Sequence, residues 1–189
     1  MKLKILFVFS FFIISQTIVA QSLGGISLQD AVTGKTQTIA DLTDQKGLVL
    51  IYFDLNCPFT KMYEGRIKAL RTKFSNQGFR FALIHSDSKA SAEELKNYID
   101  SSGMNMPFFI QSGTEANQGL GVVKIPEAFL ISKQEDIPTV IYHGAIDNNP
   151  QAENAVSERF LERAINQFLG GNMPSPSQVR ATGCNLRSF

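Results

Sequence analysis

An apolar run that leads into a cysteine and a proline is the feature that most constrains the fold. Leu48 to Phe53 reads Leu-Val-Leu-Ile-Tyr-Phe, and Cys57-Pro58 follows after three further residues. A short run that is apolar on both faces is typical of a central parallel strand covered by helices on both sides. Proline suits the first turn of a helix, where its missing N–H is not needed. We therefore predict a buried strand over residues 48–55 that leads directly into a helix.

The segment after Cys57 has the period of an amphipathic helix. Apolar residues recur every three or four positions and define one face: Phe59, Tyr63, Ile67, Leu70 and Phe74. Gly78 suits the cap that follows such a helix, and Phe79 to Ile84 reads as the next strand. A strand, a helix and a second strand in this order indicate a parallel crossover.

The remaining elements complete an alternation of strands and helices. We predict a hairpin from 26–28 and 36–39, a helix from the capping box 91–94 to about residue 99, an edge segment at 107–111, strands at 128–131 and 139–142 around a turn at 133–136, and a helix at 157–169 ended by two glycines. There is no internal repeat and no sign of a second domain. This order favours an α/β fold with a mixed sheet.

The first twenty residues have the three parts of a secretory signal peptide. Lys2 and Lys4 precede the apolar stretch Ile5 to Ile14, and small residues end at Ala20. The alternative is a membrane anchor, but the stretch is too short to span a bilayer comfortably. We expect residues 1–20 to be a cleaved signal peptide. The mature protein would then be exported, periplasmic in a two-membrane bacterium, and without a stable membrane anchor.

The charge and length of the mature chain limit its function classes and its number of domains. Removing two lysines from 18 basic residues leaves 16 against 17 acidic ones, with no basic patch to bind nucleic acid. The length fits one domain with a hydrophobic core. We assign residues 21–171 to that domain and 172–189 to a flexible tail, rich in proline and serine, that carries Cys184.

The two cysteines are the candidate reactive groups. Cys57 lies between a strand and a helix, where unpaired backbone N–H groups and the helix dipole favour a thiolate, the reactive form. The alternative is a small apolar core residue, and the position favours the reactive role. Two cysteines in an exported chain suggest a disulfide. Cys184 is then a resolving thiol, or part of a structural or an intermolecular disulfide.

Several short motifs together resemble a known family. They are Tyr52-Phe53, the site Cys57-Pro58-Phe59-Thr60-Lys61, Tyr63 to Ile67, Ile125-Pro126, Tyr142 to Pro150, and Gly183 to Arg187. In this order they resemble the thioredoxin-like superfamily, and within it the peroxiredoxin-like redoxins of the AhpC/TSA type. The resemblance covers nearly all of the mature chain. It implies a thioredoxin-like fold with a central mixed β-sheet flanked by helices.

The resemblance also implies roles for individual residues. Cys57 would be the catalytic thiol, and Cys184 would resolve its oxidised form. Pro126 would follow a cis peptide bond against the active sulfur and shape a substrate groove with Ile125, Thr60 and Pro58. The alternative for Pro126 is an ordinary trans proline at a strand start.

The chain departs from the family pattern at three positions. Thr60 stands where thioredoxins carry a second cysteine, so no local disulfide can form. Leu50 and Asp54 stand where typical peroxiredoxins carry proline and a hydroxyl residue. Asp54 would raise the pKa of the Cys57 thiol if the two face each other. We expect Lys61 and Arg66 on the helix surface.

The histidines do not suggest another chemistry. His85 and His143 end predicted strands, and we expect them to be ordinary polar residues there. A Cys-His-Asp hydrolase would need one of them beside Cys57. No recognisable ligand spacing predicts a metal site, and no glycine-rich loop predicts a nucleotide cofactor. We expect no metal and no cofactor.

Three functions remain, in this order. The first is a thiol peroxidase that reduces peroxides through Cys57 and is reduced again by an external dithiol. The second is a thiol–disulfide oxidoreductase acting on protein or small-molecule disulfides. The third is a non-catalytic binding protein in which Cys57 and Cys184 form a fixed bridge.

Overall fold

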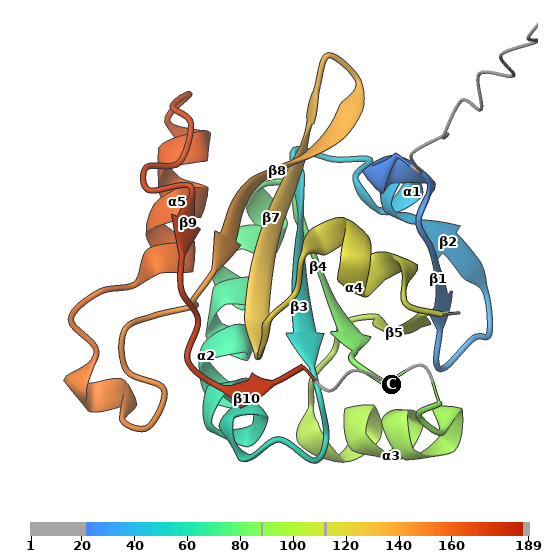
Figure 1. Cartoon of the computed structure of the whole chain (residues 1–189). Helices are drawn as coiled ribbons and strands as arrows, with labels where there is room; N and C mark the ends of the chain where they lie inside the picture. Colours follow the sequence, from blue (N-terminus) through green and yellow to red (C-terminus); the bar gives the residue numbers. More distant parts are fainter. Residues whose placement is uncertain (1–21, 88, 112, 187–189) are drawn as a thin grey trace, which may run out of the picture.

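The centre of the molecule is an eight-stranded mixed sheet, seen in a computed structural model that describes residues 22–87, 89–111 and 113–186 (Figure 1). The strand order is β2-β1-β5-β4-β3-β7-β8-β9. The strands are β1 (Ser27–Asp30), β2 (Thr36–Thr38), β3 (Gly47–Phe53), β4 (Phe79–His85), β5 (Phe108–Gln111), β7 (Glu127–Gln134), β8 (Ile137–Gly144) and β9 (Gln178–Val179). A separate pair joins β6 (Lys124–Ile125) to β10 (Cys184–Asn185). The predicted signal peptide lies outside the described residues.

Helices connect the strands and cover the sheet. They are α1 (Ile39–Leu42), α2 (Pro58–Phe74), α3 (Ala92–Ser102), α4 (Glu115–Leu120) and α5 (Phe160–Leu169), with short 3-10 turns at Leu23–Gly25, Ser75–Gln77 and Glu153–Ala155. Within the described ranges, no helix has the length and apolar character needed to cross a membrane.

The central strand β3 confirms the first prediction. All seven of its residues are buried, and it runs parallel to β4 and antiparallel to β7. It ends at Phe53, two residues earlier than predicted. The reason is a turn in which the Asp54 carboxylate accepts from the Asn56 N–H and its carbonyl accepts from the Cys57 N–H. This turn places Cys57 at the start of α2.

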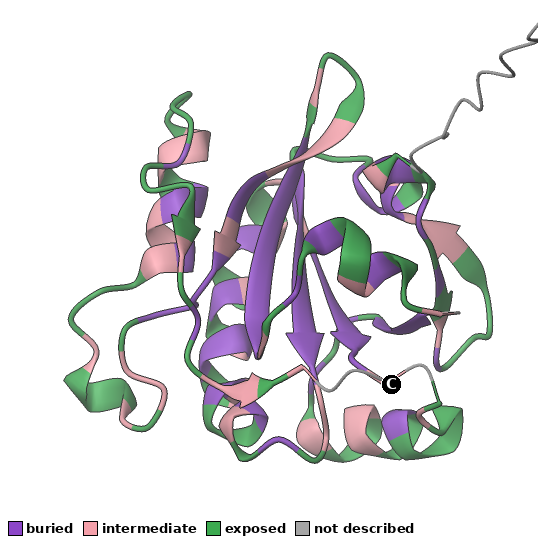
Figure 2. Ribbon diagram, viewed as in Figure 1, coloured by how far each residue is buried: buried purple, intermediate pink, exposed green. Residues whose placement is uncertain are grey.

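Two hydrophobic clusters cover the two faces of β3. Val49, Ile51 and Phe53 belong to a cluster with residues of α2 and α5, whereas Leu48, Leu50 and Tyr52 belong to one with residues of α1 and α4. Figure 2 shows the central strands buried along their length and the helices buried on the sides that face them. The expected α/β fold with a mixed, helix-covered sheet is confirmed.

β5 and the last helix also differ from the predictions. β5 was expected at an edge, but it lies between β1 and β4, because the N-terminal hairpin returns to pair outside it. The last helix begins at Phe160, three residues later than predicted. The backbone N–H groups of Ser157 and Glu158 donate to the Asn148 side-chain oxygen, which holds that segment against a loop.

The C-terminal tail forms two short strands over its described part. β9 pairs parallel with the end of β8, and β10 pairs antiparallel with β6. The sequence predicts a flexible tail here, since a two-residue strand has no hydrophobic period to detect. The backbone pairing orders this segment along the sheet. The domain boundary at residue 171 stays a prediction.

Candidate active site

Cys57 occupies the N-cap of α2 and is almost fully buried. Its side chain makes no capping hydrogen bond, and Pro58 follows at the first helical position, as predicted. Only 3% of the residue is exposed. The Thr60 N–H donates to the Cys57 carbonyl, which starts the helix beneath the sulfur. The sulfur therefore lies at the positive end of a 17-residue helix.

Cys57 is joined to Cys184 in a disulfide. The two Cα atoms are 6.1 Å apart, although 127 positions separate the residues in sequence. The structure thus brings together both cysteines that the sequence singled out. It favours a bond within the chain over an intermolecular one. Within the described part of the chain no free cysteine remains.

The Ile125–Pro126 segment lies against the Cys57 sulfur. Its peptide bond is cis, as the resemblance implies. The Ile125 carbonyl oxygen lies 3.3 Å from Cys57 Sγ. Thr60 is fully buried, and among the described residues its hydroxyl has no hydrogen-bond partner. Pro58 is exposed at the helix start. The four proposed substrate-binding residues thus lie at the sulfur or in the first turn of α2.

A small pocket opens beside the disulfide. Its volume is about 90 Å³, which suits a ligand of a few atoms. Beside the two cysteines, its lining consists of Asp54, Asn56, His85, Asp87, Ile125 and Asn185. Two acidic residues and one histidine give this pocket an acidic character.

The Asp54 carboxylate is held by its neighbours. One oxygen accepts from the Asn56 N–H and the other from the Ser86 hydroxyl, at 2.8 and 2.7 Å. His85 Nε2 lies 3.9 Å from the first oxygen. His85 is buried, and the Leu55 N–H approaches its Nε2 at 3.4 Å. No pattern in the sequence reveals this group of side chains, because it forms only when the ends of β3 and β4 lie side by side.

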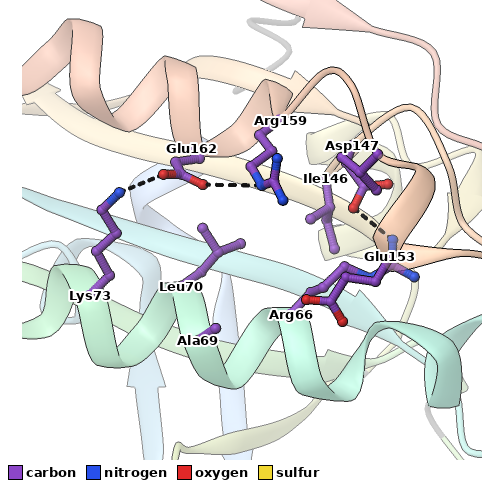
Figure 3. A pocket seen from close by; sticks show the side chains of 10 residues that line it. Arg66, Ala69, Leu70, Lys73, Ile146, Asp147, Glu153, Arg159 and Glu162 are labelled. Atoms are coloured by element: carbon purple, nitrogen blue, oxygen red, sulfur yellow. Dashed lines mark hydrogen bonds and ion pairs between the residues drawn. The ribbon is translucent and has the colours of Figure 1, made fainter.

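Arg66 is buried, which corrects the prediction of a surface residue. Its guanidinium donates to Asp147 Oδ2 at 2.7 Å and to the carbonyl oxygens of Asn149 and Pro150 at 2.8 Å each. Figure 3 shows the pair from the adjoining pocket, with Asp147 above α2 and Arg66 rising from it. Tyr63 donates to the same carboxylate, and burial together with Asp147 raises the pKa of Tyr63.

This ion pair explains two of the motifs that carry the family resemblance. Tyr63 and Arg66 belong to the motif that follows Cys57, and Asp147 belongs to the motif after β8. Their contact holds the loop 147–150 against α2, whose N-cap is Cys57. The predicted surface position of Lys61, in contrast, is confirmed.

The position of Cys57 predicts an activated thiol in the reduced protein. We expect the rate of alkylation of reduced Cys184→Ser protein by iodoacetamide to rise with pH around a midpoint below about 8.5, the value of a free cysteine. The helix dipole and unpaired N–H groups stabilise the thiolate, while the nearby Asp54 acts in the opposite direction. A midpoint at or above the free value would show that Asp54 and burial dominate.

Comparison with solved structures finds proteins of similar fold. A protein of Geobacillus kaustophilus described as an uncharacterized conserved protein has a TM-score of 0.76 at 19% identity, covering 87% of this chain and 88% of its own. A hypothetical protein from Sinorhizobium meliloti has a TM-score of 0.75 at 21% identity, covering 92% and 97%. A thiol:disulfide interchange protein from Bacteroides sp. has a TM-score of 0.59 at 13% identity, covering 77% and 86%.

At these low identities, the TM-scores show a shared fold, and this fold is thioredoxin-like. No curated protein matches the sequence. The model of the AhpC/TSA family matches residues 19–140, which include β3, Cys57 and the cis proline. With the site's geometry and this match together, the chain belongs to the AhpC/TSA family of redoxins.

Proposed function

We propose that the protein is an exported two-cysteine redoxin in which Cys57 attacks an oxidised substrate and Cys184 resolves the product. The observation that carries the proposal is the disulfide between a cysteine at a helix N-terminus and a cysteine on a tail strand. A bond of this kind stores one two-electron oxidation within the chain. An external dithiol would return the two electrons and restore both thiols.

Peroxide is the first candidate substrate. The Cys57 thiolate attacks one oxygen of the O–O bond, forming a sulfenic acid and releasing the other oxygen as water or an alcohol. The Cys184 thiolate then attacks the sulfenic sulfur of Cys57, and the sulfenic oxygen takes up a proton and leaves as water as the disulfide forms. Membership of the AhpC/TSA family and the small pocket beside Cys57 support this reading.

We expect peroxide reduction to be slow. Leu50 is buried in the hydrophobic cluster that β3 shares with α1 and α4. Asp54 is acidic, and its carboxylate accepts a hydrogen bond from the Ser86 hydroxyl. Neither supplies the groups that bind peroxide in typical peroxiredoxins. The family resemblance therefore supports the reaction, whereas these two positions argue against a fast one.

A disulfide substrate is the second candidate. It is favoured by the way in which Cys184 reaches the site, as part of an extended strand alongside Ile125. Solved structures with the same fold include a thiol:disulfide interchange protein and a thiol-disulfide oxidoreductase, both from Bacteroides. In this reaction Cys57 forms a mixed disulfide with the substrate, and Cys184 releases it.

Intact mass spectrometry distinguishes the candidates. Reduced mature protein is mixed with one equivalent of hydrogen peroxide, or in a parallel sample with oxidised glutathione. Loss of two hydrogens within minutes in peroxide, with the Cys57–Cys184 bond confirmed by peptide mapping, supports the peroxidase. Reaction with oxidised glutathione, but not with peroxide, supports the second candidate. No reaction with either oxidant would indicate a non-catalytic binding role.

A further inference from the structure

His85 is a buried ionisable side chain whose role the proposed function leaves open. It ends β4 beside Phe53, the last residue of β3, and only 4% of the residue is exposed. The centre of the Phe108 ring lies 6.0 Å from the centre of the histidine ring. A neutral histidine carries one proton, and the contacts of its two ring nitrogens decide where that proton sits. These contacts therefore show what the His85 ring can do with a proton.

Each nitrogen of the His85 ring has both a donor and an acceptor near it. Nδ1 lies 3.2 Å from the Asp87 backbone nitrogen and 3.3 Å from the Asp87 carbonyl oxygen. Nε2 lies 3.4 Å from the Leu55 backbone nitrogen and 3.9 Å from Asp54 Oδ1. A proton on Nε2 faces the Asp54 carboxylate, whereas a proton on Nδ1 faces the Asp87 carbonyl, and in each case a backbone N–H meets the other nitrogen. The ring can therefore take up a proton at one nitrogen and give one up at the other.

The ring of His85 belongs to the walls of two pockets. One is the small pocket that both cysteines line. The other has a volume of about 370 Å³ and is also lined by Lys89 and Glu94, which are exposed. A proton that reaches the ring from the side of the sulfurs can therefore leave on the side of the exposed residues.

Four charged side chains line these two pockets with the ring. Asp54 follows β3, Asp87 and Lys89 follow β4, and Glu94 belongs to α3, whereas β5 contributes the apolar ring of Phe108. The Asp87 carboxylate accepts from the Lys89 N–H at 2.8 Å. The Asp54 carboxylate is the one that makes an ion-pair contact with the ring. Asp54 is therefore the positioning residue for this histidine.

We propose that His85, positioned by Asp54, accepts the proton of the Cys184 thiol when Cys184 attacks oxidised Cys57. The inference rests on the proposed function in requiring that Cys184 is the resolving thiol. Only a thiolate attacks, so this thiol must lose its proton first. A free thiol with a pKa of about 8.5 is mostly protonated at neutral pH, and histidine is the side chain that most often serves as a base there.

The proton goes to a different place with each candidate substrate. After peroxide, Cys184 forms the S–S bond while the S–O bond of the Cys57 sulfenic acid breaks. His85 takes the thiol proton and returns one to the leaving oxygen, which departs as water. After a disulfide substrate, Cys184 displaces the substrate's sulfur from Cys57 as a thiolate, and the proton leaves through the outer pocket. Closure of the bond uses the histidine on either route.

A coloured disulfide reagent tests the relay without peroxide. Reduced protein, freed of reductant, is mixed with the aromatic disulfide dithiobis-nitrobenzoate in a stopped-flow spectrometer. One thionitrobenzoate is released when Cys57 attacks the reagent, and a second when Cys184 closes the bond. His85→Gln keeps a donor and an acceptor at this position but takes up no proton. We expect this variant to slow the second release at least about tenfold at pH 7.

The pH profile separates proton transfer from a change in structure. Near about pH 9.5 a thiol of ordinary pKa ionises in water without a base, so the deficit of His85→Gln should shrink to about twofold. A variant that only misplaces Cys184 stays slow at every pH. Asp54→Asn should show the same pH-dependent deficit, because it removes the charge that stabilises the protonated ring. This second variant carries the test if His85→Gln does not fold.

His143→Gln is the matched control. Its ring packs against Phe129 and lines neither of the two pockets, so both releases should keep the rates of the unmodified protein. A second release that is unchanged in His85→Gln at pH 7, or equally slow at all pH values, would overturn the relay.

Failure of the proposed function has a different signature. Cys57→Ser would then release the first thionitrobenzoate as fast as the unmodified protein does, or the bond between Cys57 and Cys184 would not form. A protein that is inert to peroxide still gives both releases in this experiment. Conversely, a redoxin that closes its disulfide equally fast without His85 would keep its proposed function and lose the relay.

Discussion

Replacing Cys57 with serine should lower redox turnover at least about a thousandfold, because a serine hydroxyl does not ionise at neutral pH and cannot take up the oxidising equivalent. Cys184→Ser should instead leave the first oxidation intact and stop the cycle there. Reduced Cys184→Ser protein treated with one equivalent of peroxide should carry a sulfenic acid at Cys57. Mass spectrometry after trapping with dimedone measures it.

The two variants control for each other, since each removes the same disulfide. Any loss of stability that follows from losing the bond is common to both. If Cys184→Ser also failed to undergo the first oxidation while keeping its far-ultraviolet circular dichroism, the assignment of Cys57 as the attacking thiol would be wrong. If Cys57→Ser retained turnover, Cys184 would be the attacking residue.

Asp147→Ala should destabilise the fold by about 3–5 kcal/mol, since it leaves the Arg66 charge buried without its partner. The side chains of Arg66 and Asp147 are only 8% and 3% exposed. The substitution also removes the acceptor of the Tyr63 hydroxyl. Urea unfolding of the oxidised variant, compared with the oxidised unmodified protein, gives the difference in free energy.

Asp100→Ala provides a matched control. Asp100 pairs with Lys96 four residues away on α3, and both side chains are more than half exposed. An exposed pair of this kind contributes about 0.3–0.5 kcal/mol. Equal unfolding midpoints for Asp147→Ala and Asp100→Ala would show that the Arg66 pair is solvated in solution and does not fix the loop.

The sequence predicts the elements that have a pattern of their own. β3 is a run of consecutive apolar residues, and α2 repeats such residues every three or four positions. The turn between β7 and β8 consists of Glu135 and Asp136, both with positive φ, and lies within the turn predicted at 133–136. The sequence suggests a Cys57–Cys184 pair because the chain has two cysteines, but it leaves an intermolecular disulfide open.

Other features depend on contacts between distant segments. Arg66 lies on the buried face of α2. Apolar periodicity does not predict its burial, because the charge is balanced by Asp147, 81 residues away in sequence. Phe59 was predicted on that face and is only half-buried, with Thr60 buried beside it. The internal place of β5 follows from pairing with β1, which no local pattern of residues 107–111 reveals.

The short strand β9 also has a consequence for solubility. A sheet edge with unpaired backbone groups invites pairing with the edge of another molecule, and proteins protect such edges with short strands, proline or a covering segment. Here β2, at one side, has three residues. At the other side β8 carries Pro138 near its start, and β9 covers its end at His143 and Gly144. The tail segment that carries Cys184 therefore also covers a sheet edge and opposes edge-to-edge aggregation. A chain shortened before β9 would lose that protection.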